Sequence, residues 1–131
     1  MHSGLVISRS DGRPMYLQIM EQIRQRIAVG DWARGSEIPS IRQLAVALRV
    51  SVITIKRAYL ELEREGVIVT QHGKGSSVAE YPGLQPRLYD QELAHHLTQV
   101  ARLAELLGIT PEELVSRVRE AADLLERSIH E

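Results

Sequence analysis

The sequence has 131 residues, of which 44% are hydrophobic, and this is enough for one modest core or for a small domain with an appendage. Its lack of cysteine excludes disulfide bonds and thiolate metal sites. No stretch approaches the roughly 20 apolar residues of a membrane span, and the N-terminus lacks the charged and then apolar layout of a signal peptide. We therefore expect a soluble protein of the cytoplasm with no membrane partner.

Charge is distributed unevenly along the chain. The 16 basic and 17 acidic side chains nearly cancel, so the whole chain gives no global sign of nucleic-acid binding. Residues 1–80, however, hold 11 basic and 8 acidic side chains, whereas residues 81–131 hold 5 and 9. The two parts of the chain therefore differ in the sign of their net charge.

The first predicted element is an amphipathic helix that starts near Pro14, which fits the first helical turn because its missing N–H costs nothing there. Gly30 is expected to end it. Apolar residues recur between them at intervals of three and four, as one face of a helix requires: Tyr16, Ile19, Met20, Ile23 and Ile27.

Two capped helices follow. Ser40 and Gln43 form a capping box at the start of a helix over 41–48, and Ser51 is a good N-cap for the next one. The second helix begins with β-branched residues, which favour a strand by propensity. Its apolar positions nevertheless have helical spacing through Leu62, so the pattern predicts a helix.

A β-hairpin is predicted over 67–79, because two short β-prone runs flank a turn with Gly73 and Gly75. Pro82, Gly83 and Pro86 then interrupt the chain, and we interpret residues 81–87 as a linker.

Two further helices are predicted after the linker, with a stop at Gly108 and a new start at Thr110–Pro111. Each carries an apolar stripe, but two helices this short cannot bury both stripes against each other alone. We expect a second copy of the chain to cover them in a homodimer. The residues expected at this contact are Leu93, Leu97, Val100, Leu107, Leu114, Val118 and Leu125.

The predicted fold is mostly α with a small β-hairpin: a winged helix-turn-helix domain over 1–80, the linker 81–87, and an α-helical dimerisation region over 88–131. Such a domain suits duplex DNA. The second helix of the motif carries Val52, Ile53, Lys56 and Arg57 opposite its apolar face, near the end that enters a major groove.

The run SEIPSIRQLAVALRVSVITIKRAYLELEREGVIVTQHGKGSSV resembles the winged-helix domain of GntR-family transcription regulators, and the short helical tail resembles that of the YtrA subfamily. The resemblance implies that Ser40 and Arg42 contact the DNA backbone or a base edge. It also implies that Ser51, Thr54 and Lys56 lie at the recognition helix, with His72, Gly73 and Lys74 at a wing tip over the minor groove.

Val52 departs from the family pattern, which commonly has arginine at this position. An arginine fork grips guanine O6 and N7, whereas valine can only touch a thymine methyl. The usual guanine contact is therefore in doubt, and Val52 and Ile53 are candidate apolar readers of thymine.

Patterns that resemble catalytic or ligand sites lack the partners that they need. The turn 73–76 resembles a phosphate-binding loop, but Ile68 stands where that loop requires glycine. His95 and His96 are adjacent on a predicted helix, so they point about 100° apart, and no carboxylate pattern completes a metal site. The acidic run at 61–65 has no nucleophile or histidine at hand. We expect no enzyme, metal or cofactor.

The sequence therefore predicts a bacterial DNA-binding transcription regulator, most simply a homodimeric repressor that binds an inverted-repeat operator in double-stranded DNA. The YtrA resemblance implies control of its own or a neighbouring transporter operon, with an unidentified small molecule as a possible effector. The alternative is a winged-helix module for protein interaction and assembly without a specific operator.

Overall fold

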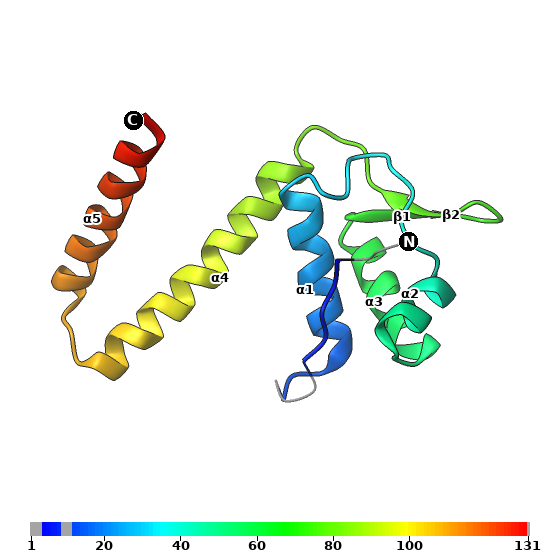
Figure 1. Cartoon of the computed structure of the whole chain (residues 1–131), viewed down its shortest axis with the longest axis horizontal. Helices are drawn as coiled ribbons and strands as arrows, with labels where there is room; N and C mark the ends of the chain where they lie inside the picture. Colours follow the sequence, from blue (N-terminus) through cyan, green and yellow to red (C-terminus); the bar gives the residue numbers. More distant parts are fainter. Residues whose placement is uncertain (1–3, 9–11, 131) are drawn as a thin grey trace. The chain divides into compact units, whose positions relative to one another are not determined.

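The computed structural model describes residues 4–8 and 12–130, which form two compact units that meet between Asp90 and Gln91. The first unit holds α1 (Met15–Ala28), α2 (Ile41–Leu48), α3 (Val52–Arg64), β1 (Ile68–Gln71), β2 (Gly75–Val78) and the start of α4 (Leu84–Leu107). The second unit holds the rest of α4 and α5 (Pro111–His130) (Figure 1). This order of elements confirms the predicted fold class: a mostly helical chain with one hairpin.

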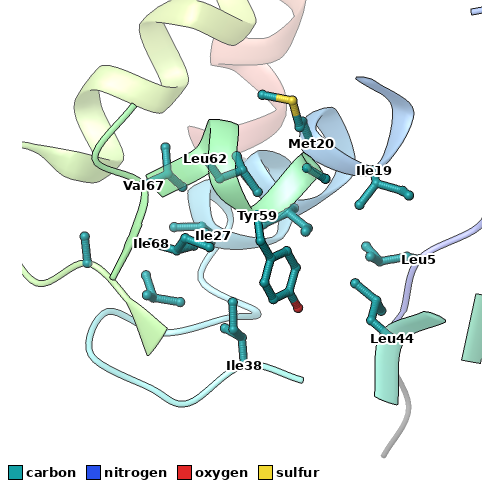
Figure 2. Close-up of a cluster of buried hydrophobic side chains, with 14 of the residues drawn as sticks. Leu5, Ile19, Met20, Ile27, Ile38, Leu44, Tyr59, Leu62, Val67 and Ile68 are labelled. Carbon is teal, nitrogen blue, oxygen red and sulfur yellow. The ribbon is translucent and has the colours of Figure 1, made fainter. Parts of the chain in front are cut away.

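The core of the first unit forms where α3 packs against both α1 and α2. The apolar stripe of α1 faces it, with Ile19, Ile23 and Ile27 buried, because residues three and four apart share one helix face. Figure 2 shows the ring of Tyr59 among aliphatic side chains of this core. Its hydroxyl donates a hydrogen bond of 2.6 Å to the carbonyl oxygen of Pro39.

The wing is a two-stranded antiparallel hairpin whose register pairs Ile68 with Val78 and Gln71 with Gly75. Its root is held by the segment between α1 and α2: Gly35 donates to the Val78 carbonyl at 3.0 Å, and Ile38 donates to the Ser76 carbonyl at 3.0 Å. These bonds occupy the outer edge of β2. The turn between the strands projects away from the helices of this unit (Figure 1).

Residues 4–8 run along α1 (dark blue in Figure 1), an arrangement that the sequence pattern did not predict. The side-chain amide of Gln22 pairs with both the N–H and the carbonyl of Val6, and the amide of Gln18 does the same with Ser8. Leu5 joins the core. Side chains of α1 thus hold this segment as a neighbouring strand would.

The start of the fourth helix differs from our prediction. We expected residues 81–87 to be linker, but α4 begins at Leu84, and both Leu84 and Leu88 are buried in the core of the first unit. Pro86 lies in the first turn, where its missing N–H breaks no helical hydrogen bond. The helix can therefore begin between the two prolines, and burial of Leu84 and Leu88 stabilises its first turns.

The second unit leaves most of its apolar side chains in water. Thr110 caps α5 by accepting a hydrogen bond of 3.1 Å from the Glu113 N–H, as the sequence predicted. No described residue of α5 is buried. A groove of about 450 Å³ between α4 and α5 has an almost wholly apolar lining, formed by Leu97, Val100, Leu114, Val115, Val118 and Ala122, with Arg119 beside them.

Neither long helix suits a bilayer. Among the described residues, no helix combines the length and the apolar composition that crossing a membrane requires.

Candidate nucleic-acid interface

The helix-turn-helix is built by two serine caps and one left-handed residue. Ser40 accepts a 3.1 Å hydrogen bond from the Gln43 N–H, while the Gln43 side chain accepts one of 2.9 Å from the Ser40 N–H. This is the capping box that the sequence predicted. Arg49 ends α2 with φ of 57°, a conformation that arginine rarely adopts, and so turns the chain sharply into α3.

Ser51 opens α3. Its hydroxyl oxygen accepts a 3.1 Å hydrogen bond from the Thr54 N–H and lies 2.7 Å from the Thr54 hydroxyl. The caps therefore set where each helix begins. The exposed hydroxyl groups of Ser40 and Ser51 consequently lie at two helix N-termini, a position that favours phosphate.

The buried face of α3 is the one that the spacing predicted, but Val52 does not lie opposite it. Ile55, Ala58, Tyr59 and Leu62 are buried, which confirms that tertiary packing overrides the β-branched preference of this stretch. Ile53 lies on the opposite side of the helix and is 79% exposed, whereas Val52 stands three residues before Ile55, at the edge of the buried face in the first turn, and is 47% exposed. These two side chains are not part of the core, and Lys56 is exposed beside them.

Arg57 lies differently from the other candidate residues. Its guanidinium carbon is 3.8 Å from the ring centroid of Tyr16, and its Nη2 donates a 3.2 Å hydrogen bond to the Tyr16 hydroxyl. We predicted Tyr16 as a core residue of the first helix, and it packs only partly buried against that core. Sequence spacing could not reveal this pair, because 41 residues separate its members.

Basic and acidic side chains are segregated along the helix-turn-helix motif. From Ser40 to Leu60 the sequence contains no carboxylate but four cations: Arg42, Arg49, Lys56 and Arg57. All four side chains are exposed. Glu61 and Glu63 then follow in the C-terminal half of α3, and Glu65 is its C-cap. Glu61 pairs with Arg64 at 2.8 Å, and Glu65 pairs with Arg24 of α1 at 2.9 Å. The N-terminal half of α3 therefore presents only positive charge.

The predicted wing tip residues His72, Gly73 and Lys74 are exposed at the hairpin turn. Gly73 and Gly75 have φ of +78° and +79°, values that glycine adopts without strain. The Lys74 N–H donates to the Gln71 carbonyl at 2.9 Å, which closes the turn. The side chains of His72 and Lys74 are thus held on a tight and outward-pointing loop.

Other ionisable groups form no evident site. Within the described part of the chain, no group of three or more histidines and carboxylates is arranged to hold a metal ion. His96 lies 3.7 Å from Glu92, one turn earlier on α4. Burial raises the pKa of the Tyr59 hydroxyl well above its ordinary value, which keeps this group neutral and able to donate its hydrogen bond to Pro39.

Comparison with known proteins supports these features. A family model described as "Bacterial regulatory proteins, gntR family" matches residues 15–78. A GntR family transcriptional regulator from Listeria monocytogenes has a similar structure, with a TM-score of 0.74 and 31% identity; the match covers 85% of this chain and 97% of that one.

Two further likenesses bear on the DNA-binding unit. The chain is 39% identical over 67 residues to the HTH-type transcriptional repressor YtrA of Bacillus subtilis. This match covers 51% of the chain and 52% of YtrA. The matched stretch is thus about half of each protein. The DNA-binding domain of AraR, solved in complex with operator ORX1, is similar at a TM-score of 0.54 with 27% identity, over 60% of this chain and 99% of that domain.

The likeness to the Listeria regulator extends over nearly the whole of that protein, beyond the residues that the family model matches. The chain therefore belongs to the GntR family of bacterial regulatory proteins.

Proposed function

We propose that this member of a family of transcription regulators is a sequence-specific repressor that binds an inverted-repeat operator as a homodimer. The observation that carries the proposal is the N-terminal half of α3, which is exposed, free of carboxylates and capped by Ser51. An AraR domain with this architecture binds its operator, and YtrA is a repressor. The chain resembles the YtrA subfamily, it does its work on DNA in the bacterial cytoplasm, and it catalyses no reaction.

In this proposal α3 lies in the major groove. Val52 and Ile53 touch thymine methyl groups, because their exposed aliphatic side chains have no donor or acceptor to offer a base edge. Thr54 and Lys56 lie on the same half of α3. Ser40, Arg42 and Ser51 contact phosphates at the starts of α2 and α3.

The wing contributes contacts of a different kind. Lys74 neutralises a phosphate, and His72 offers a donor to the minor groove, where the small Gly73 permits close approach of the backbone. These contacts strengthen binding to every sequence and so add affinity without base preference.

The homodimer is formed by the second unit. Apolar side chains form a stripe along each of its helices, and an exposed patch of this kind marks an interaction surface in a protein that is otherwise well packed. A second copy is the occupant that fits, because a regulator that reads an inverted repeat needs two recognition helices related by a twofold axis. Leu93, Leu97, Val100, Leu107, Leu114, Val118 and Leu125 form this contact.

The resemblance to the YtrA subfamily favours a target near the gene for this protein, in a transporter operon. An effector, if one acts, is a small molecule at the contact between the two copies, where the groove between α4 and α5 offers apolar space.

Fluorescence anisotropy with the promoter region upstream of the gene tests the proposal. At fixed salt, a specific regulator binds this duplex about 1,000-fold or more tightly than a scrambled duplex of equal length. Equal affinities that fall equally with salt would instead favour the alternative, a winged-helix assembly module with only non-specific DNA binding.

A further inference from the structure

Arg57 of α3 is tied to the start of α1. Its guanidinium carbon lies 3.8 Å from the centroid of the Tyr16 ring, and its Nη2 donates a 3.2 Å hydrogen bond to the Tyr16 hydroxyl. The ring contact and the hydrogen bond act on the same guanidinium, so together they restrict where it can point.

The pair lies at the border of the DNA-facing surface. Arg57 is on the side of α3 opposite Ile55 and Tyr59, and long side chains on a helix lean toward its N-terminus. The Arg57 side chain therefore reaches over the turn at Ile53, in the half of α3 without carboxylates. Tyr16 meets it there from the first turn of α1.

The remaining N–H donors of Arg57 suit a contact with a phosphate. A guanidinium has five N–H donors, and the bond to Tyr16 uses one of them. The rest have no partner among the described residues and can grip a phosphate, whose oxygens match the guanidinium fork. To read a base edge, the same group would have to leave both the ring and the hydroxyl of Tyr16.

We propose that Tyr16 is a positioning residue that holds Arg57 against a DNA phosphate beside the recognition helix and keeps it off the base edges. This inference rests on the proposed function, because it assigns a role to one contact of the same DNA-binding surface. It separates Arg57 from Val52, Ile53 and Lys56, with which the sequence had grouped it.

A simple packing role explains the pair less well. The α1 and α3 helices already share a continuous core that includes Ile19, Ile23 and Leu62, whereas the guanidinium of Arg57 lies at the exposed rim. An exposed cation over an aromatic ring adds little to stability. Its effect is to restrict where the cation can go.

The test measures how the affinity of the full chain for the promoter duplex and for a scrambled duplex depends on salt. Arg57→Ala should weaken binding to both duplexes by about tenfold and reduce the slope of log affinity against log salt by about one. Tyr16→Ala should weaken both by about threefold. In the double variant the Tyr16→Ala change should have no further effect on DNA binding, because the contribution of Tyr16 to that binding is carried by Arg57.

Matched variants guard against a general structural effect. Tyr16→Phe keeps the ring and should retain most of the affinity. Arg64→Ala removes the same charge from the same helix, but Arg64 is paired with Glu61 at 2.8 Å near the other end, so the slope should not change. If the alanine variants fail to fold, Arg57→Lys serves in their place. It keeps the charge without the planar fork, so it should preserve the slope and lose affinity.

Two results would overturn the inference: additive effects of Tyr16→Ala and Arg57→Ala, or an Arg57→Ala variant that changes preference at one base pair with an unchanged slope. Failure of the proposed function looks different. In that case the wild-type chain itself would bind the promoter and scrambled duplexes equally, while the slopes on the scrambled duplex would still report on Arg57.

Discussion

The two units of this chain treat their apolar residues in opposite ways. In the unit that ends at Asp90, nineteen buried side chains from all its helices, its strands and residues 4–8 form one core. In the unit that begins at Gln91, leucines and valines recur with equally regular helical spacing, yet only Ala104 is buried among the described residues. The same periodic pattern therefore has two different outcomes: burial within one chain, and an apolar surface that one chain leaves exposed.

The two units therefore differ in the interactions that stabilise them. The winged helix is stabilised by its own packing, whereas α5 has no buried side chain to offset the cost of ordering its backbone. If a second copy covers the tail, the stability of the tail must depend on protein concentration. The stability of the winged helix should not depend on it.

The largest effect is expected from Leu97→Asp, which should weaken the proposed dimer contact of the tail. Leu97 is 50% exposed in one chain, but the proposed dimer would bury two carboxylates without partners, at a total cost of about 4 kcal/mol or more, which raises the dissociation constant about 1,000-fold or more. Sedimentation velocity measures this change. Leu106→Asp is the matched control, because Leu106 is 78% exposed and lies outside the apolar stripe. A Leu97→Asp variant that still sediments as a dimer would refute our placement of the interface.

Ile55→Ala should destabilise the winged helix. Ile55 is fully buried beneath α3, and the cavity left by alanine should lower the free energy of unfolding of the winged helix by about 3 kcal/mol. Urea denaturation at a fixed protein concentration checks this value. Val46→Ala on α2 removes an apolar side chain that is 78% exposed and should change the stability by less than about 0.5 kcal/mol. Equal losses in the two variants would mean that the core is not where we place it.

Val52→Arg tests whether the base preference belongs to the winged helix. Arginine at this position can grip a guanine, so the preference at one base pair should shift by about 2 kcal/mol in favour of guanine. Titration of operators substituted one base pair at a time measures it. Val46→Arg adds the same charge elsewhere and should leave the preference unchanged. If Val52→Arg also leaves it unchanged, then Val52 only packs against the DNA or the protein.

Lys74→Ala should have a smaller and less selective effect. Loss of one phosphate contact at the wing should weaken binding to all sequences and lower the slope of log affinity against log salt by about one. Lys74→Arg should restore the slope. An unchanged slope in the alanine variant would remove Lys74 from the interface.

The smallest effect concerns the pH dependence of the winged helix. Burial raises the pKa of Tyr59 in the folded state, so folding favours the neutral hydroxyl. Its contribution is therefore complete below the ordinary pKa of about 10 and is lost as the pH rises above it. Tyr59→Phe should cost about 1 kcal/mol at neutral pH, because the Pro39 carbonyl loses its donor, and should flatten this alkaline decline.

Thermal melting between pH 8 and pH 11 measures the decline, and the exposed Tyr89 provides the control. Tyr89→Phe should melt like the wild type across this range. An alkaline decline that survives in Tyr59→Phe would assign it to another group.

Many helix starts and turns could be predicted because their signals are local. The caps at Ser40, Ser51 and Thr110 and the glycines of the turns each depend on residues within one turn of chain, and the structure has them where the pattern put them. The start of α4 was mistaken because Pro82 and Pro86 are local breakers, whereas burial of Leu84 depends on residues far along the chain.

The features that the sequence did not reveal are all long-range. Docking of residues 4–8 depends on the amides of Gln18 and Gln22, which sit on a helix face with no pattern that distinguishes them from other polar residues. The contact of Tyr16 with Arg57 likewise joins distant segments. For the dimer, the sequence predicted the apolar stripes of α4 and α5, and the structure adds that these helices leave them uncovered within one chain.

The mass of the complex between the full chain and its operator tests the account most directly. Sedimentation equilibrium at a protein concentration near the dissociation constant should find two chains on one inverted-repeat duplex, with no stable complex that contains one chain. A single chain that binds the whole operator with full affinity would contradict the claim that the exposed tail exists to pair two copies of the winged helix.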